Sequence, residues 1–335
     1  MLEKLALAFG VSGCEGEVRD IILSRISADS VNVDFMGNII AFREGSGSKQ
    51  QKKTILLAAH MDEVGFIVSR VTGDGFLKFK TIGGIASEIL PAKRVLVGTD
   101  KIPGVIGCTP KHLMKKGSDS KQSTDDLFID VGLDKSSIKE RIKPGDYACF
   151  DSGFVRFGDG LVKCKALDDR VGCAVLLQLM ERQFFNDVYF AFTVQEEIGC
   201  RGSKVAAASI DCDYAFVVET TTCADLFSSD LDNALFSTVL GSGVAVSVFD
   251  GGSYADKQLS DYACKLAEEN GIPVQRKRTT FGGNDAVSIQ SSKEGVRLSV
   301  LSVPCRYIHS PSCVCSTSDI KACSALLDAL LCNLR

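Results

Sequence analysis

The sequence of 335 residues contains no tryptophan and only three histidines. It also lacks an uninterrupted apolar run of about 18 residues, the length that a membrane-spanning helix needs, so such a helix is excluded. Charges interrupt the apolar N-terminal stretch MLEKLALAFG, which is not the layout of a signal peptide. The lack of tryptophan removes the largest flat aromatic face, which weighs against a sugar-binding cleft.

Basic residues do not outnumber acidic ones. The formal net charge of -4 at pH 7 argues against nucleic acid or an anionic membrane as a partner. The 14 cysteines show no paired C-x-x-C spacing, and the closest pair is Cys313 and Cys315. In a chain of this size without a secretion signal, scattered cysteines indicate core residues and free thiols in a reducing cytoplasm. The length allows two domains with a substantial core.

Two acidic pairs flank one predicted helix and one predicted strand. Asp168-Asp169 precedes residues 171–180, whose apolar positions have helical spacing, and Glu196-Glu197 follows the uncharged apolar run 188–194. That run is typical of a strand buried on both faces. Strand, helix and parallel strand form one βαβ unit, so both pairs fall at the carboxyl edge of a sheet. Because an acidic pair alone is usually a solvated turn, a functional interpretation needs partners from elsewhere.

Three further apolar strands end beside residues that could be such partners. Residues 54–59 (TILLAA) run into His60, residues 214–218 (YAFVV) into Glu219, and residues 296–303 (VRLSVLSV) into the segment with His309. Five side chains therefore share one predicted edge: His60, Asp168, Glu197, Glu219 and His309. Two imidazoles with three carboxylates suit Zn²⁺, Co²⁺ or Mn²⁺, and a bridging carboxylate would complete two three-ligand shells. A buried acidic cluster without cations would be costly.

The neighbours of His60 and the remaining histidine have separate predicted places. Asp62 could hydrogen-bond the His60 imidazole and fix its tautomer, as is usual around a ligand histidine. Glu63 is predicted to be solvated. His112 has no clustered partners, and we expect it in a loop or an interface rather than in a metal shell.

Short alternating strands replace helical spacing from about residue 68. Residues 65–79 predict two strands around the turn Gly73-Asp74-Gly75, and residues 94–98 and 105–107 predict two more. The polar stretch 111–126 predicts a mobile loop. We therefore expect an α/β catalytic domain over residues 1–67 and 161–335, interrupted by a small all-β, barrel-like domain over residues 68–160. Residues 234–240 predict a further strand of the α/β domain.

Several motifs occur together in the order of a known family: LAFGVSGCEGEVR, AAHMDEVGFIV, the IGGI run at 82–85, LFIDVG, KALDDR, TVQEEIGCRGS, GGNDA and RYIHSP. With these motifs the chain resembles the tetrahedral, dodecamer-forming dinuclear metallo-aminopeptidases, a family of glutamyl and deblocking aminopeptidases with relatives described as endoglucanases. The resemblance covers essentially the whole chain. It implies a zinc-peptidase-like mixed sheet flanked by helices, with an inserted β domain that serves oligomerisation and shapes the cleft.

The resemblance also implies two divalent metal ions per chain, Zn²⁺ or Co²⁺ foremost and Mn²⁺ as a further option. The implied ligands are the five side chains above: His60 with Glu219 for one ion, His309 with Glu197 for the other, and Asp168 as the bridge. The family has a cis peptide bond after the bridging aspartate, here Asp168-Asp169. It usually has an aspartate at the position of Glu219, and the longer side chain bears on metal preference more than on activity.

Other roles follow from the same resemblance. Asp62 would orient His60, and Glu196 would be the general base that takes a proton from the attacking water and passes it to the leaving amine. Gly283, Asn284 and Asp285 would contact the substrate. Asn284 replaces the family's usual threonine, and the stretch after Asp225 lacks the usual Pro-Gly, which could alter substrate contacts.

The implied function is a metal-dependent aminopeptidase that removes N-terminal amino acids from short peptides. The implied assembly is a cytoplasmic homo-oligomer, a dodecamer built from dimers. A metal-dependent deacylase or carboxypeptidase on the same fold remains an alternative, and an amino-acid p-nitroanilide compared with an N-acetylated peptide decides between them.

Two more remote alternatives are an endoglucanase and a non-catalytic assembly protein. The adjacent Glu196 and Glu197 suit a glycosidase poorly, because its two carboxyls flank the bond at about 5 to 9.5 Å from each other. Polysaccharide turnover that survives a chelator would favour the endoglucanase. Purified protein without bound metal would favour the assembly protein.

Overall fold

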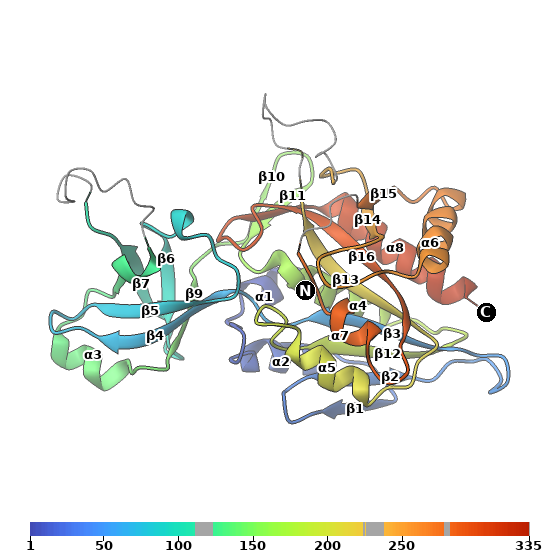
Figure 1. Ribbon diagram of the computed structural model, residues 1–335, viewed down its shortest axis with the longest axis horizontal. Helices are drawn as coiled ribbons and strands as arrows, with labels where there is room; N and C mark the ends of the chain where they lie inside the picture. Colours follow the sequence, from blue (N-terminus) through green and yellow to red (C-terminus); the bar gives the residue numbers. More distant parts are fainter. Residues whose placement is uncertain (111–122, 224, 226–237, 278–281, 335) are drawn as a thin grey trace.

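The computed structural model describes residues 1–110, 123–223, 225, 238–277 and 282–334 (Figure 1). A large mixed sheet covered by helices forms one part, and a closed β-barrel forms the other. The predicted fold class, an α/β sheet with an inserted all-β barrel, is confirmed. In the described part of the chain, no helix is both long and apolar enough to cross a bilayer.

The large sheet mixes parallel and antiparallel strands. Its described strands follow the order β1-β2-β12-β3-β13-β16-β17-β11-β10, and β14 and β15 extend it beside β16. The neighbours β12, β3, β13 and β16 are parallel, so their carboxyl ends lie at one edge. The strands are β1 Ser30–Val33, β2 Ile39–Arg43, β3 Thr54–His60, β10 Val155–Phe157, β11 Leu161–Cys164, β12 Asp187–Thr193, β13 Tyr214–Thr222, β14 Val244–Ser247, β15 Val274–Lys277, β16 Arg297–Arg306 and β17 Cys313–Ser316.

The central strands are buried on both faces, as their uncharged runs predict. In β3, Leu57 belongs to the core on one face of the sheet, and Leu56 and Ala58 belong to the core on the other. Successive side chains of a strand point to opposite faces, so one continuous apolar run contributes to two cores.

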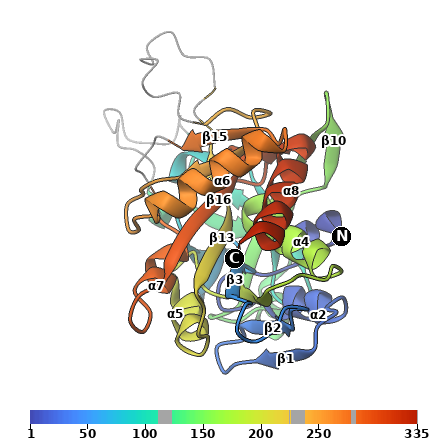
Figure 2. The same cartoon turned by 90° about the vertical axis from the view of Figure 1, so that its right-hand side faces the viewer.

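Helices cover the two faces of this sheet (Figure 2). The larger core includes residues of α1, α2, α4, α6 and α8, and the smaller core includes residues of α5 and α7. Their bounds are α1 Leu2–Leu7, α2 Gly16–Leu23, α4 Leu167–Leu179, α5 Arg201–Ala208, α6 Lys257–Glu269, α7 Ala286–Gln290 and α8 Thr317–Asn333. Asp256 caps α6 by accepting a hydrogen bond from the backbone N–H of Leu259.

The barrel has its own core. Phe66 is fully buried in this core, and its ring packs edge-on against the rings of Phe79 and Phe150. Six strands close the barrel in the order β4-β5-β8-β7-β6-β9. Their bounds are β4 Gly65–Val71, β5 Leu77–Ile82, β6 Arg94–Val97, β7 Ile102–Gly107, β8 Phe128–Asp130 and β9 Tyr147–Phe150, with helix α3 at Lys135–Arg141 and the short 3-10 helices η1 Ser87–Ile89 and η3 Thr124–Asp126.

Parts of three predictions lie outside the described residues: most of the loop 111–126, His112, and most of the strand 234–240. Three strands of the large sheet, β10, β15 and β17, were not predicted. They have three or four residues each, which is too short for a periodic pattern to stand out. Whether such a short segment forms a strand depends on its hydrogen bonds to neighbouring strands.

Candidate metal centre

The ends of the parallel strands bring the predicted site residues together. His60 is the last residue of β3 and pairs in register with Thr193, the last residue of β12, so Glu196 and Glu197 follow close by. Glu219 differs from the prediction, because it lies inside β13 rather than beyond it. This strand continues to Thr222 since β16 supplies hydrogen-bonding partners as far as Cys305.

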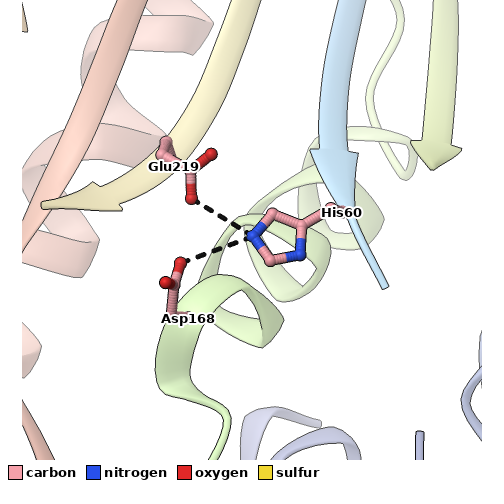
Figure 3. Close-up of side chains that lie close together, drawn as sticks. All are labelled: His60, Asp168 and Glu219. Carbon is pink, nitrogen blue, oxygen red and sulfur yellow. Dashed lines mark ion pairs between the residues drawn. The ribbon is translucent and has the colours of Figure 1, made fainter. Parts of the chain in front are cut away.

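One group of potential ligands surrounds His60 (Figure 3). Its Nε2 lies 3.4 Å from Oε1 of Glu219 and 3.5 Å from Oδ1 of Asp168. These three side chains come from β3, β13 and the start of α4, and all three residues are buried. Their ligand atoms lie within 4.8 Å of one another, close enough to hold one metal ion.

A second group uses the other oxygen of Asp168. The Nε2 of His309 lies 3.3 Å from Oδ2 of Asp168 and 3.3 Å from Oε2 of Glu197. Asp168 is therefore common to both groups and faces one histidine with each oxygen. The peptide bond between Asp168 and Asp169 is cis, as the family resemblance implies. Within the described ranges, these two are the groups that could hold a metal ion.

Both histidines are held by their other ring nitrogen. Nδ1 of His60 lies 3.1 Å from the backbone carbonyl oxygen of Asp62 and 3.4 Å from its carboxylate. Nδ1 of His309 lies 2.8 Å from the carbonyl oxygen of Gly84, in the loop that follows β5 of the barrel. Protons on Nδ1 leave each Nε2 free to face the carboxylates.

The carboxylates of the centre are crowded and buried. Burial, followed by the charge of Asp168, raises the pKa of Glu197 to about 7 and that of Glu219 to about 8, although the histidines act in the opposite direction. Asp168 and Glu197 raise the pKa of His309 to about 10, against the effect of its burial. The cluster therefore retains protons at neutral pH unless a cation replaces them.

The residues present fit a pair of divalent cations. Oδ1 of Asp168 is buried and has no hydrogen-bond donor among the described residues, and a buried carboxylate oxygen without a partner is unfavourable. A cation between His60, Asp168 and Glu219 would satisfy it. Imidazole nitrogens combined with carboxylate oxygens are a donor set that Zn²⁺, Co²⁺ and Mn²⁺ accept.

Glu196 stands beside the two groups without belonging to either. Its Oε2 lies 3.9 Å from Nε2 of His60, and its Oε1 accepts a hydrogen bond from the Cys200 thiol. Burial raises the pKa of Glu196 well above its usual range, and the charge of Glu219 adds to this. The side chain borders a cavity of about 370 Å³, which is lined by Gly84, Asp168, Glu196, Glu197, Gly199, Cys200, Glu219, Thr220, Thr221, Thr222, Lys277, Gly282, Gly283, Asn284, Ile308 and His309.

The turn before α7 meets this cavity in part. Gly283 and Asn284 line it. Asp285 is 1% exposed and accepts a hydrogen bond of 2.5 Å from the hydroxyl of Thr193 at the end of β12. Its carboxylate therefore ties the turn to the sheet edge.

Sequence reasoning missed two buried lysines near the centre, Lys165 and Lys277. Lys165 is 2% exposed, and its Nζ lies 2.7 Å from the carboxylate of Glu63. The prediction that Glu63 is solvated is wrong, because Glu63 is also 2% exposed. Lys277, at the end of β15, lines the cavity. A lone lysine in a polar sequence usually marks a solvated surface, so no local signal could have placed either one.

Comparisons with known proteins match this geometry. The sequence model of M42 glutamyl aminopeptidases matches residues 37–326. An aminopeptidase structure from the archaeon Desulfurococcus kamchatkensis is 34% identical, with a TM-score of 0.93 over 99% of this chain and 94% of that one. A Pyrococcus horikoshii TET1 peptidase, described as able to assemble into a tetrahedron or a large octahedral shell, is 33% identical, with a TM-score of 0.86 over 99% and 98%. The lysyl aminopeptidase of Pyrococcus furiosus is 31% identical over 99% of this chain and 96% of its own length.

Proposed function

Since the chain belongs to the M42 glutamyl aminopeptidase family and is an aminopeptidase of this metallopeptidase class, we propose that it removes N-terminal residues from short peptides with the help of two divalent cations. The observation that carries this proposal is the sharing of Asp168, whose two oxygens lie 3.5 and 3.3 Å from the Nε2 atoms of His60 and His309. A single carboxylate between two histidines suits a bridged pair of ions. In this proposal, His60 and Glu219 hold one ion, and His309 and Glu197 hold the other.

When bound, the two ions supply Lewis acidity that activates a water molecule and polarises the peptide carbonyl. Glu196 then takes the proton of the attacking water and delivers it to the leaving amine nitrogen. Its position beside both groups, its place on the cavity wall and its raised pKa support this role. Asp62 would position His60 and the segment that carries Glu196. Gly283 and Asn284, which line the cavity, would contact the peptide.

Zn²⁺ and Co²⁺ are the metals we favour, with Mn²⁺ as the alternative. The two-histidine, three-carboxylate set supports all three. Glu219 takes the place of a shorter aspartate, so the ion beside His60 is the one whose preference we expect to differ from that of relatives.

We also propose a homo-oligomer, a dodecamer built from dimers, in the cytoplasm. The tetrahedral assembly described for the Pyrococcus horikoshii relative supports the first part, and scattered cysteines without paired C-x-x-C spacing support the second. The division into a catalytic domain (1–67 and 161–335) and an assembly domain (68–160) belongs to the same proposal; the barrel strands themselves run from Gly65 to Phe150, and β10 lies in the large sheet. Native mass spectrometry checks the number of 35.9 kDa chains, and a monomer at working concentration would contradict the dodecamer.

One set of assays tests the activity. The purified protein is depleted of metal with a chelator, reloaded separately with Zn²⁺, Co²⁺ or Mn²⁺, and offered alanine p-nitroanilide, the peptide Ala-Ala-Ala and its N-acetylated form. We expect metal-dependent release of the first residue from both substrates with a free amine and none from the acetylated peptide. Cleavage of the acetylated peptide without cleavage of alanine p-nitroanilide would favour a deacylase or a carboxypeptidase instead.

A further inference from the structure

One buried cation borders the cavity beside the candidate metal centre. Lys277 is the last residue of β15, is 9% exposed, and lines the cavity together with Glu196 and residues of both metal groups. Among the described residues of the lining it is the sole lysine or arginine. Buried ammonium groups normally pair with an anion, because an isolated charge out of water is unfavourable.

No anion of the described chain fills this role. Burial lowers the pKa of the Lys277 ammonium, and the charges of Asp250, Glu219 and Asp168 raise it. The ammonium forms no hydrogen bond with any of these three carboxylates. Asp250 is already satisfied by other donors. Its carboxylate accepts from the backbone N–H groups of Gly252 and Ser253, from the Ser253 hydroxyl, and from the side-chain amide of Asn284.

The other two carboxylates belong to the candidate metal centre. Glu219 and Asp168 would be offset by the divalent cations of the proposed function. In the loaded enzyme, Lys277 would then border the cavity without a compensating charge. An anionic group of a bound molecule would supply it.

The rest of the lining disfavours a large apolar side chain. Among the described residues of the lining, Ile308 is the one large aliphatic residue, and none is aromatic. Thr220, Thr221 and Thr222 and several glycines make up much of the remainder. Sites for apolar side chains are lined mainly by apolar groups, whereas threonines, backbone N–H groups and one ammonium suit a carboxylate.

We propose that the ammonium of Lys277 binds a carboxylate of the peptide substrate. This inference rests on the proposed aminopeptidase function. It names the chemical group of the substrate that the site prefers, which family membership leaves open. The carboxylate comes from one of two sources: the acidic side chain of the first residue, or the C-terminus of a dipeptide.

Two substrate pairs distinguish these sources. Glutamate p-nitroanilide and glutamine p-nitroanilide differ in the charge of the side chain, and Ala-Ala and Ala-Ala-amide differ in the charge of the terminus. For the metal-loaded enzyme we expect kcat/KM to be higher for the charged member of one pair. Lys277→Met should lower kcat/KM for that member by about 10- to 100-fold, because a charge-assisted hydrogen bond is lost, and leave the neutral member within about twofold of the wild-type rate, since the neutral member makes no such bond.

Arg276→Met is the matched control. Arg276 is the preceding residue of β15, but its guanidinium pairs with Asp261 of α6 at 2.5 Å. This variant should leave both substrate ratios unchanged. Lys277→Arg keeps the charge and should retain much of the preference for the charged substrate.

Several results would overturn the inference. Equal losses on all four substrates in Lys277→Met would show that the lysine only supports the fold, and unchanged rates would show that it binds nothing. If Lys277→Met does not fold, the wild-type enzyme alone tests the inference. A kcat/KM that is no higher for the charged member of either pair rejects the inference. Failure of the wild-type enzyme to cleave any of the four would instead reject the proposed aminopeptidase function itself.

Discussion

The backbone N–H of Glu196 donates a hydrogen bond of 2.9 Å to the carboxylate of Asp62. The N–H of Glu197 donates to the other oxygen at 3.1 Å, and the hydroxyl of Ser12 donates to that oxygen at 2.6 Å. Burial alone would raise the pKa of Asp62, but its interactions with His60 and the hydrogen bonds from Ser12 and Glu196 lower it. One ionised carboxylate thus holds the segment that carries the proposed base and a proposed metal ligand.

Asp62→Asn should lower kcat by about 10- to 100-fold, the usual effect of losing a partner that supports a metal site. Asparagine replaces one carboxylate oxygen of Asp62 with an NH₂ group, which would face a backbone N–H instead of accepting a hydrogen bond from it. The measurement is kcat at saturating metal. Ser12→Ala, which leaves both acceptor oxygens in place, should cost less activity, and a wild-type kcat in Asp62→Asn would contradict the positioning role.

Glu196→Gln should bind metal normally and lose activity by about 100-fold or more, because the amide cannot accept the proton of the attacking water. Steady-state kinetics and the metal content of the same preparation check this. Glu268→Gln, an exposed glutamate on α6, serves as the control and should be fully active. Near wild-type turnover in Glu196→Gln would remove the base assignment.

Asp168→Ala should lose both metal ions, since each proposed shell takes one of its oxygens. His309→Ala removes a ligand from one shell only and should retain about one ion per chain. Elemental analysis of dialysed protein measures both ratios. Two ions per chain in Asp168→Ala would mean that the carboxylate is no bridge.

Glu63→Gln should lower the free energy of unfolding by about 3 to 5 kcal/mol, because it leaves the buried ammonium of Lys165 without its counter-charge. The guanidinium of Arg170, fully buried as well, lies 3.5 Å from the same oxygen of Glu63. Urea unfolding of metal-loaded protein gives the comparison. Glu269→Gln breaks an exposed pair with Lys265 and should change stability by less than about 1 kcal/mol; an equally small effect in Glu63→Gln would mean that the buried pair contributes little.

Asp256→Ala should lower stability by about 1 to 2 kcal/mol through loss of the N-cap of α6. The Arg297 guanidinium, which donates to the same carboxylate at 2.7 Å, lowers the pKa of Asp256 below its ordinary value of 3.8. The ion-pair contribution is therefore present above pH 3.8 and is lost as the pH falls through the lower folded-state value.

Asp256→Asn separates the two effects, since asparagine also caps helices well but forms no ion pair. Its stability deficit relative to wild type should be largest near neutral pH and should shrink as the solution is acidified. Thermal unfolding between pH 7 and pH 3 measures it. A deficit that grows on acidification would contradict the direction of the pKa shift.

The candidate centre was predictable where local pattern and topology agree. Uncharged apolar runs before His60 and before Glu196 mark buried parallel strands, and such strands end at a common edge. Glu63 shows where this reasoning stops. Its charge predicts solvent exposure, yet Lys165, more than 100 positions away, neutralises it in the core. A single-sequence pattern carries no information about that pairing.

The sequence by itself determined the α/β class, the all-β insertion and the strand ends that carry imidazoles and carboxylates, because hydrophobic periodicity is a local property. Only the tertiary structure decided that each oxygen of Asp168 faces a different histidine, that the carbonyl of Gly84 beside the barrel holds His309, and that Lys277 lines the cavity. These relationships join residues far apart in the chain, and they depend on how the sheet, barrel and helices pack rather than on the pattern within any one of them.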